Sequence, residues 1–140
     1  MIKIDKKVIH SIRNSICVSL IESGGIIGSS KRGIITNYYF DFTSCGSFNE
    51  YIPNTKIMNN VIEKWGEGEI KFCGMIHSHP KEHTTLSFSD IAYAKNILYN
   101  FEWFDHIYMI IVTPESSRNF LSIYQIHKDG NFKQVNWCEI

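Results

Sequence analysis

The centre of the chain reads Ile70-Lys71-Phe72-Cys73-Gly74-Met75-Ile76-His77-Ser78-His79-Pro80, an apolar run that ends in two histidines and a proline. Such a run predicts a buried β-strand over residues 70–79. Side chains on a strand alternate between its two faces, so His77 and His79 project from the same face. The sequence therefore predicts two imidazoles side by side at the end of a strand, an arrangement suited to binding a metal ion.

A carboxylate follows soon afterwards, at Asp90, three residues beyond Ser87. Two imidazoles and a carboxylate are ligands that Zn²⁺ accepts, and they leave one position of a tetrahedral ion open. An open position is typical of catalytic zinc, which lowers the pKa of a water there to about 7. The plainer interpretation is that Ser87 and Asp90 form the capping box of a helix. Capping explains this pair but leaves the two histidines unexplained, so we favour a metal site.

Composition and charge narrow the class of protein. The chain has 140 residues, of which 44% are hydrophobic, and its formal net charge is zero. These values predict one globular domain over residues 1–140, with no electrostatic reason to bind nucleic acid or an anionic membrane. The sequence has no signal-peptide core and no run of membrane-spanning length. The widely spaced cysteines favour reduced thiols, so we expect a cytoplasmic protein. They are Cys17, Cys45, Cys73 and Cys138.

Hydrophobic periodicity and turn residues predict both helices and strands. The helices are expected at 5–19, 54–68 and 89–100, and the strands at 2–4, 22–28, 34–42, 70–79, 106–113, 120–127 and 132–137. Asp129-Gly130-Asn131 reads as a hairpin turn. Some strands are separated by helices and others by tight turns. The expected fold class is therefore α/β or α+β, with a mixed sheet and helices packed against it.

Hydrolysis at a metal site requires a group that accepts the proton of the attacking water. The residues alone offer two candidates, Glu82 in the loop after Pro80 and Glu22 between a helix and an apolar strand. Partial burial of a carboxylate raises its pKa toward the range useful for a base. Glu22 can equally be read as an ordinary acid at a helix end, so the sequence alone leaves the base open.

Three segments together resemble the JAMM (MPN+, JAB1/Mov34) zinc metalloprotease family. They are Glu22-Ser23-Gly24-Gly25-Ile26-Ile27-Gly28, His77-Ser78-His79-Pro80 and Ser87-Phe88-Ser89-Asp90. More narrowly, the compact chain resembles the stand-alone JAB proteins of bacteria, although Leu86 stands where many relatives have proline. The resemblance implies a single MPN/JAB-like domain in which helices flank a curved mixed sheet, with layers like those of cytidine deaminases.

The resemblance also implies a role for each residue of the site. His77, His79 and Asp90 would bind one catalytic Zn²⁺. Glu22 would accept a proton from the attacking water and deliver it to the leaving amine, and Ser87 would donate a hydrogen bond to the oxyanion. Loss of such a donor typically lowers kcat by about 10²–10³.

The implied function is a zinc-dependent isopeptidase or peptidase that hydrolyses the bond after the C-terminal glycine of a ubiquitin-like protein, in deconjugation or precursor processing. The implied setting is a bacterial ubiquitin-like conjugation or anti-phage defence system, with E1- and E2-like enzymes as partners. Two alternatives stay open: processing of the tail of a sulfur-carrier protein, and a non-catalytic MPN scaffold.

Two segments are candidate walls for a substrate protein. One is the loop at 43–53, and the other is the aromatic stretch Phe101-Glu102-Trp103-Phe104-Asp105. The aromatic stretch has two interpretations. The plainer one is a turn that caps the core, and the other is a hydrophobic platform for a substrate protein.

Overall fold

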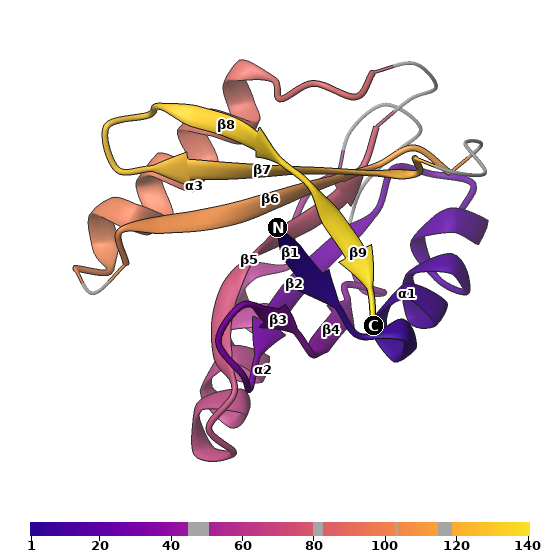
Figure 1. Cartoon of the computed structure of the whole chain (residues 1–140), viewed down its shortest axis with the longest axis horizontal. Coiled ribbons are helices and arrows are strands. Elements are labelled where there is room, and N and C mark those ends of the chain that lie inside the picture. Colours follow the sequence, from indigo (N-terminus) through magenta and orange to yellow (C-terminus); the bar gives the residue numbers. More distant parts are fainter. Residues whose placement is uncertain (45–50, 80–82, 103, 115–118) are drawn as a thin grey trace.

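The computed structural model of this chain describes residues 1–44, 51–79, 83–102, 104–114 and 119–140. Within them, the centre of the molecule is a mixed sheet of β2 (Gly24–Ser29), β4 (Asn37–Phe40), β5 (Lys71–Ser78), β6 (His106–Val112), β7 (Leu121–His127) and β8 (Phe132–Val135). The strand order is β4-β2-β5-β6-β7-β8. Strands β5 and β6 are parallel, whereas the other neighbours in this sheet are antiparallel (Figure 1). The predicted mixed sheet is confirmed.

A smaller sheet lies across one face of the central one. It consists of β1 (Ile2–Ile4), β3 (Ile34–Ile35) and β9 (Trp137–Glu139), in the order β3-β1-β9. The first and last strands of the chain are therefore parallel neighbours (Figure 1). Helix α1 (Lys6–Arg13) and a short 3₁₀ helix, η1 (Ile16–Val18), pack on the same face. Helices α2 (Thr55–Glu67) and α3 (Phe88–Asn100) cover the opposite face.

Alternation along the central strands divides the interior into two cores. Ile27 and Ile76 face the small sheet and α1, whereas their neighbours Ile26 and Met75 face α2 and α3. This is the period-2 pattern of a strand that is buried on both faces. It explains why β2 and β5 are apolar almost throughout, instead of alternating with polar residues.

A bulge in β5 sets which residues share the face with the histidines. Ile27 pairs with Gly74 but Gly28 pairs with Phe72, so Cys73 is the extra residue. Because the bulge shifts the alternation by one position, Phe72 joins Met75 in the core under α2 and α3. His77, two residues beyond Met75, points to the same side as Met75.

Three predicted elements differ from the structure. The helix expected at 5–19 ends at Arg13, and Leu20, just beyond the expected helix, is 87% exposed. The chain turns at Asn14 and buries Ile16 through η1 instead. The strands expected at 34–42 and 132–137 are each split in two, because β3 and β9 leave the central sheet to pair with β1.

The ends of the other elements agree closely with the sequence signals. Asp5 and Asn54 cap α1 and α2, and Gly68 follows α2, although Gly66 lies within that helix and does not end it. The hairpin turn between β7 and β8 is confirmed, with Gly130 at φ +88°. Among the described helices, none combines the length and apolar composition that a membrane crossing requires.

Candidate metal centre

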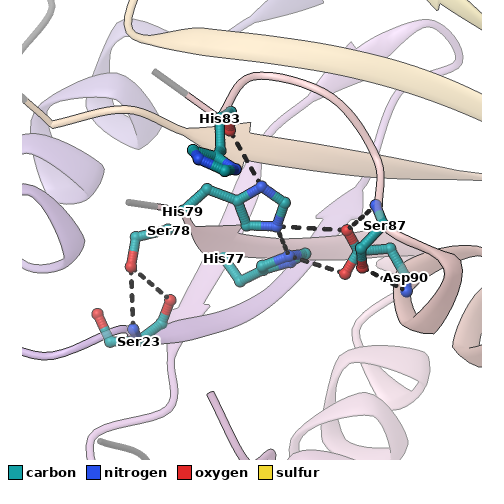
Figure 2. A network of polar contacts seen from close by, with 7 residues as sticks. All are labelled: Ser23, His77, Ser78, His79, His83, Ser87 and Asp90. Atoms are coloured by element: carbon teal, nitrogen blue, oxygen red, sulfur yellow. Dashed lines mark hydrogen bonds and ion pairs between the residues drawn. The ribbon is translucent and has the colours of Figure 1, made fainter. Parts of the chain in front are cut away.

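The predicted ligands meet where β5 ends and α3 begins. His77 is the second-last residue of β5, and His79 directly follows the end of that strand. Asp90 lies in the first turn of α3. Helix α3 is the crossover between the parallel strands β5 and β6, so its N-terminus is carried back over the carboxyl end of β5. Figure 2 shows the two imidazoles and the carboxylate turned toward one another.

The distances fit one small cation. The Nε2 atoms of His77 and His79 are 2.8 Å apart, and they lie 3.0 Å and 3.3 Å from the two oxygens of Asp90. A tetrahedral ion with bonds of about 2.1 Å has ligand atoms separated by about 3.4 Å. The three side chains offer donor atoms that all lie within 4.8 Å of one another. Nitrogen and oxygen donors in this number fit a zinc-type ion with an open position.

The tautomer of His79 is fixed by its backbone contact. Its Nδ1 lies 3.0 Å from the carbonyl oxygen of His83, which can only accept a hydrogen bond. The Nδ1 atom therefore carries the proton, and in the neutral ring Nε2 presents its lone pair to the site. In metal-binding histidines, the ring nitrogen that does not bind the metal typically donates such a hydrogen bond, because this bond orients the ring.

Asp90 both caps α3 and faces the histidines. The N–H of Ser87 donates to Oδ2 of Asp90 at 2.9 Å, and the N–H of Asp90 donates to Oγ of Ser87 at 3.1 Å. This is the reciprocal capping box that the sequence pattern allowed. The same carboxylate presents both oxygens to the imidazoles (Figure 2). The capping interpretation of the Ser87–Asp90 pair is confirmed, and it is compatible with the metal-site prediction because the cap holds the carboxylate facing the imidazoles.

The electrostatics of the site favour positive charge. Burial alone would raise the pKa of the Asp90 carboxyl, but hydrogen bonds with His77 and His79 outweigh it and hold this pKa well below its ordinary value. Burial lowers the pKa of His79, but Asp90, the His83 carbonyl and the charge of Glu22 outweigh it and raise the pKa. Two carboxylates thus create a negative potential at the imidazoles, which a bound cation would neutralise.

Glu22 and Ser87 both line the hollow that contains the three donors. This hollow has a volume of about 390 Å³, and Glu22 reaches it from the segment just before β2. Ser87 Oγ accepts the capping hydrogen bond through a lone pair, so its own hydrogen is available to donate into the hollow. The other candidate base, Glu82, lies outside the described residues.

Ser78, between the two histidines, faces away from the site and fixes the segment that carries Glu22. The backbone N–H of Ser23 donates to Ser78 Oγ at 3.0 Å, and the N–H of Ser78 donates to the Ser23 carbonyl at 2.8 Å. Both serines are buried. Figure 2 shows this pair on the opposite side of β5 from the imidazoles. Glu22 is therefore held next to the site by its neighbour in the chain.

Sequence reasoning missed Tyr51 and Asp41. Tyr51 lines the hollow with its ring nearly parallel to that of His77, at an interplanar angle of 21° and 6.3 Å between centroids. Its hydroxyl donates to Asp41 Oδ2 at 2.9 Å, and Asp41 is only 1% exposed. A Cβ on Gly24 would lie 2.5 Å from the Tyr51 ring, so this glycine makes room for it. Two adjacent glycines such as Gly24 and Gly25 indicate that another group can approach the backbone closely. The sequence does not identify Tyr51 as that group.

Comparison with solved structures supports the same fold. A protein of Desulfitobacterium hafniense with a solution structure aligns over 100% of this chain and 93% of its own, with a TM-score of 0.77 and 16% identity. A JAB1/MPN domain protein from Archaeoglobus fulgidus aligns over 99% of this chain and 97% of its own, with a TM-score of 0.59 and 18% identity. The fold is that of JAB1/MPN domain proteins.

A third structure, described as JAMM, a metalloprotease-like zinc site in the proteasome and signalosome, aligns over 100% of this chain and 98% of its own. Its TM-score is 0.57 and its identity is 17%. No protein-family profile and no curated protein matches the sequence. At these identities the likeness concerns the fold, and the His77, His79 and Asp90 cluster fits the JAMM motif by its own geometry.

Proposed function

We propose that this protein is a zinc-dependent peptidase or isopeptidase that hydrolyses the bond after the C-terminal glycine of a ubiquitin-like protein. The observation that carries the proposal is the convergence of His77, His79 and Asp90 at the end of β5, with Glu22 and Ser87 lining the same hollow. Structural ions are usually enclosed by four protein ligands, whereas three ligands beside an accessible hollow are typical of a hydrolytic site.

Each residue of the chain would have a distinct part in the reaction. A bound zinc ion would supply Lewis acidity and activate water at neutral pH. The Glu22 carboxylate would accept a proton from the attacking water and pass it to the departing amine nitrogen. The Ser87 hydroxyl would donate to the oxygen of the scissile carbonyl as negative charge develops on it. The reaction needs no covalent bond between enzyme and substrate.

The side chains that line the hollow support a substrate end without large side chains. Tyr51, Met75 and Tyr93 line the same hollow as the donor atoms, so bulky side chains bound it. An extended Gly-Gly end can bring its carbonyl between such walls, because it has no Cβ atoms to collide with them. A cytoplasmic conjugation or defence system with E1- and E2-like partners is the setting we propose for this substrate.

The test combines metal analysis with cleavage of ubiquitin-like fusions that end in Gly-Gly before the scissile bond. We expect one zinc ion per chain and cleavage after the second glycine. Glu22→Gln should keep the zinc and lower kcat by at least about 10², because the amide cannot accept the proton. Asp90→Ala should lose the zinc.

Glu67→Gln is the matched control, since Glu67 ends α2 and does not line the site. It should leave zinc content and kcat unchanged. Full activity of Glu22→Gln would remove Glu22 from the reaction. A wild-type protein that binds no zinc would instead favour the scaffold alternative, and cleavage confined to sulfur-carrier fusions would favour the processing alternative.

A further inference from the structure

A second hollow opens on the helical face of the sheet, next to the metal centre. Helix α2 packs on β2 and β5, whereas α3 packs on β6 and β7, so the two helices cover different parts of the sheet. The space between them has a volume of about 680 Å³. Its floor is formed by Ile26 of β2 and Met75 of β5.

The walls of this hollow are predominantly apolar. Met58 and Ile62 of α2 face Tyr93 and Ile97 of α3 across it, and Phe101 and Phe104 also line it. These two phenylalanines pack edge to face, 6.0 Å apart, and Phe104 packs in the same way on Phe72. Phe104 thus helps cap the core as expected, while Phe101 stays 37% exposed. An open apolar space of this size is characteristic of a binding site.

The hollow adjoins the metal centre, because Met75 and Tyr93 line both. Met75 precedes His77 by two residues on the same face of β5, a separation of about 7 Å. Tyr93 follows Asp90 by about one helical turn. A chain whose scissile carbonyl lies at the donor atoms would therefore place residues two to four positions away over the apolar walls.

We propose that this hollow, lined by α2, α3, β2 and β5, binds large apolar side chains of the substrate that lie two to four residues before the glycine whose carbonyl is attacked. The inference rests on the proposed peptidase function and adds a sequence preference to it. Charged and polar groups among the lining residues are few, and the walls offer aliphatic and aromatic carbon. A hollow of about 680 Å³ has room for more than one such side chain.

Gly66 provides a way to fill the hollow without disturbing the core. It lines the space from within α2, and a Cβ built there has no atom within 4 Å. A glycine inside a helix is also unfavourable by about 1 kcal/mol relative to alanine, so its replacement should not destabilise α2. Gly66→Trp should occupy the hollow. Asn60→Trp is the matched control, because Asn60 is exposed on the same helix and does not line the hollow.

The experiment uses zinc-loaded protein with ¹³C-labelled isoleucine and methionine methyl groups. The labelled protein is titrated with the peptides Thr-Phe-Ser-Leu-Gly-Gly and Thr-Ser-Ser-Ser-Gly-Gly to measure binding. To measure cleavage, the same two peptides are joined through their last glycine to a fluorogenic amine. We expect the apolar peptide to shift the methyl signals of Met58, Ile62 and Ile97, with at least tenfold tighter binding than the serine peptide. Gly66→Trp should remove this difference in binding and in kcat/KM with zinc content unchanged, whereas Asn60→Trp should preserve it.

The two proposals fail in different ways. Cleavage of both peptides with equal kcat/KM and no shift of these methyl groups would overturn the subsite and leave the peptidase function standing. Selective binding of the apolar peptide without cleavage would support the apolar site and count against hydrolysis. A preference that persists unchanged in Gly66→Trp would also overturn the subsite.

Discussion

At the scale of single residues, the site depends on side chains that each make two kinds of contact. Asp90 caps α3 through Ser87 and presents its oxygens to two imidazoles. His79 directs Nε2 to the site because Nδ1 bonds the His83 carbonyl. A side chain held from two sides loses little further freedom when a metal binds, which favours a preorganised centre.

Ser87→Ala tests both roles of Ser87, as the cap of α3 and as the hydrogen-bond donor to the oxyanion. Loss of the cap should destabilise the fold by about 1 kcal/mol. Loss of the hydroxyl donor should lower kcat by about 10²–10³, while zinc content stays at one per chain because Asp90 is retained. Denaturant unfolding, metal analysis and single-turnover kinetics measure the three quantities. In Ser11→Ala, which removes an exposed hydroxyl from α1 and does not alter the lining of the hollow, all three should stay near wild type. A wild-type kcat for Ser87→Ala would contradict the donor role.

Tyr51→Phe should affect stability more than metal binding. Burial, and then the nearby Asp41 carboxylate, raise the pKa of the Tyr51 hydroxyl far above its ordinary value, so the hydroxyl stays protonated and donates to Asp41. Its removal leaves Asp41 Oδ2 with the N–H of Asn54 alone. We expect a loss of about 1–3 kcal/mol in the free energy of unfolding, measured in urea. Zinc content should be unchanged because the ring beside His77 remains, and an unaltered urea midpoint would show that the hydroxyl bond contributes nothing.

At the scale of elements, the unit β5–α3–β6 builds the site and the pairing of β2 with β5 completes it. The crossover brings Asp90 over the end of β5, and the antiparallel partner β2 brings in Glu22. Asp90 and Glu22, which are distant in the sequence, therefore line the same hollow. The Ser23–Ser78 contact fixes the register of that pairing where it matters for Glu22.

Ser78→Ala should loosen this junction. The buried N–H of Ser23 would lose its acceptor, Ser78 Oγ, at a cost of about 1–3 kcal/mol. Because Glu22 adjoins Ser23, we also expect a lower kcat with zinc retained. Ser122→Ala, at another buried serine on β7, is the control and should cost less. Equal losses of stability and unchanged kcat in the two variants would mean that the Ser78 hydroxyl does not position Glu22.

Local patterns predicted the elements whose signals are themselves local. The apolar run before His77, the Ser87–Asp90 capping box and the Gly130 turn all have physical causes within a few residues. The splits at Thr36 and Asn136 were not predictable, because their cause is pairing with β1, far away in the sequence. The pairing of Tyr51 with Asp41 was hidden for the same reason.

At the scale of the whole molecule, the site lies at the edge of a three-layered structure. The small sheet with α1, the central sheet, and the α2–α3 layer enclose two separate cores (Figure 1). Helices α2 and α3 pack on different strands, and the apolar hollow lies between them beside the metal centre. This hollow could not be predicted from sequence, because it depends on how far apart two separately amphipathic helices lie on one sheet. The described cysteines, Cys17, Cys73 and Cys138, form no disulfide, so packing holds the layers together.

Metal binding should stabilise the whole fold, because β5 and α3 come together only in the folded state. Zinc at about a hundred times its dissociation constant should add about 2.7 kcal/mol to the free energy of unfolding. Thermal unfolding with added zinc, and then with a chelator, measures the effect. His79→Ala should abolish the zinc-dependent shift, and a wild-type midpoint indifferent to both additions would contradict a site formed by folding.

The most direct test is X-ray absorption spectroscopy at the zinc edge, on protein loaded with one equivalent of zinc. We predict nitrogen and oxygen neighbours at about 2.0–2.2 Å, with the outer-shell scattering of two imidazoles and no sulfur. A sulfur shell at about 2.3 Å, or a spectrum without imidazole scattering, would contradict a centre formed by His77, His79 and Asp90.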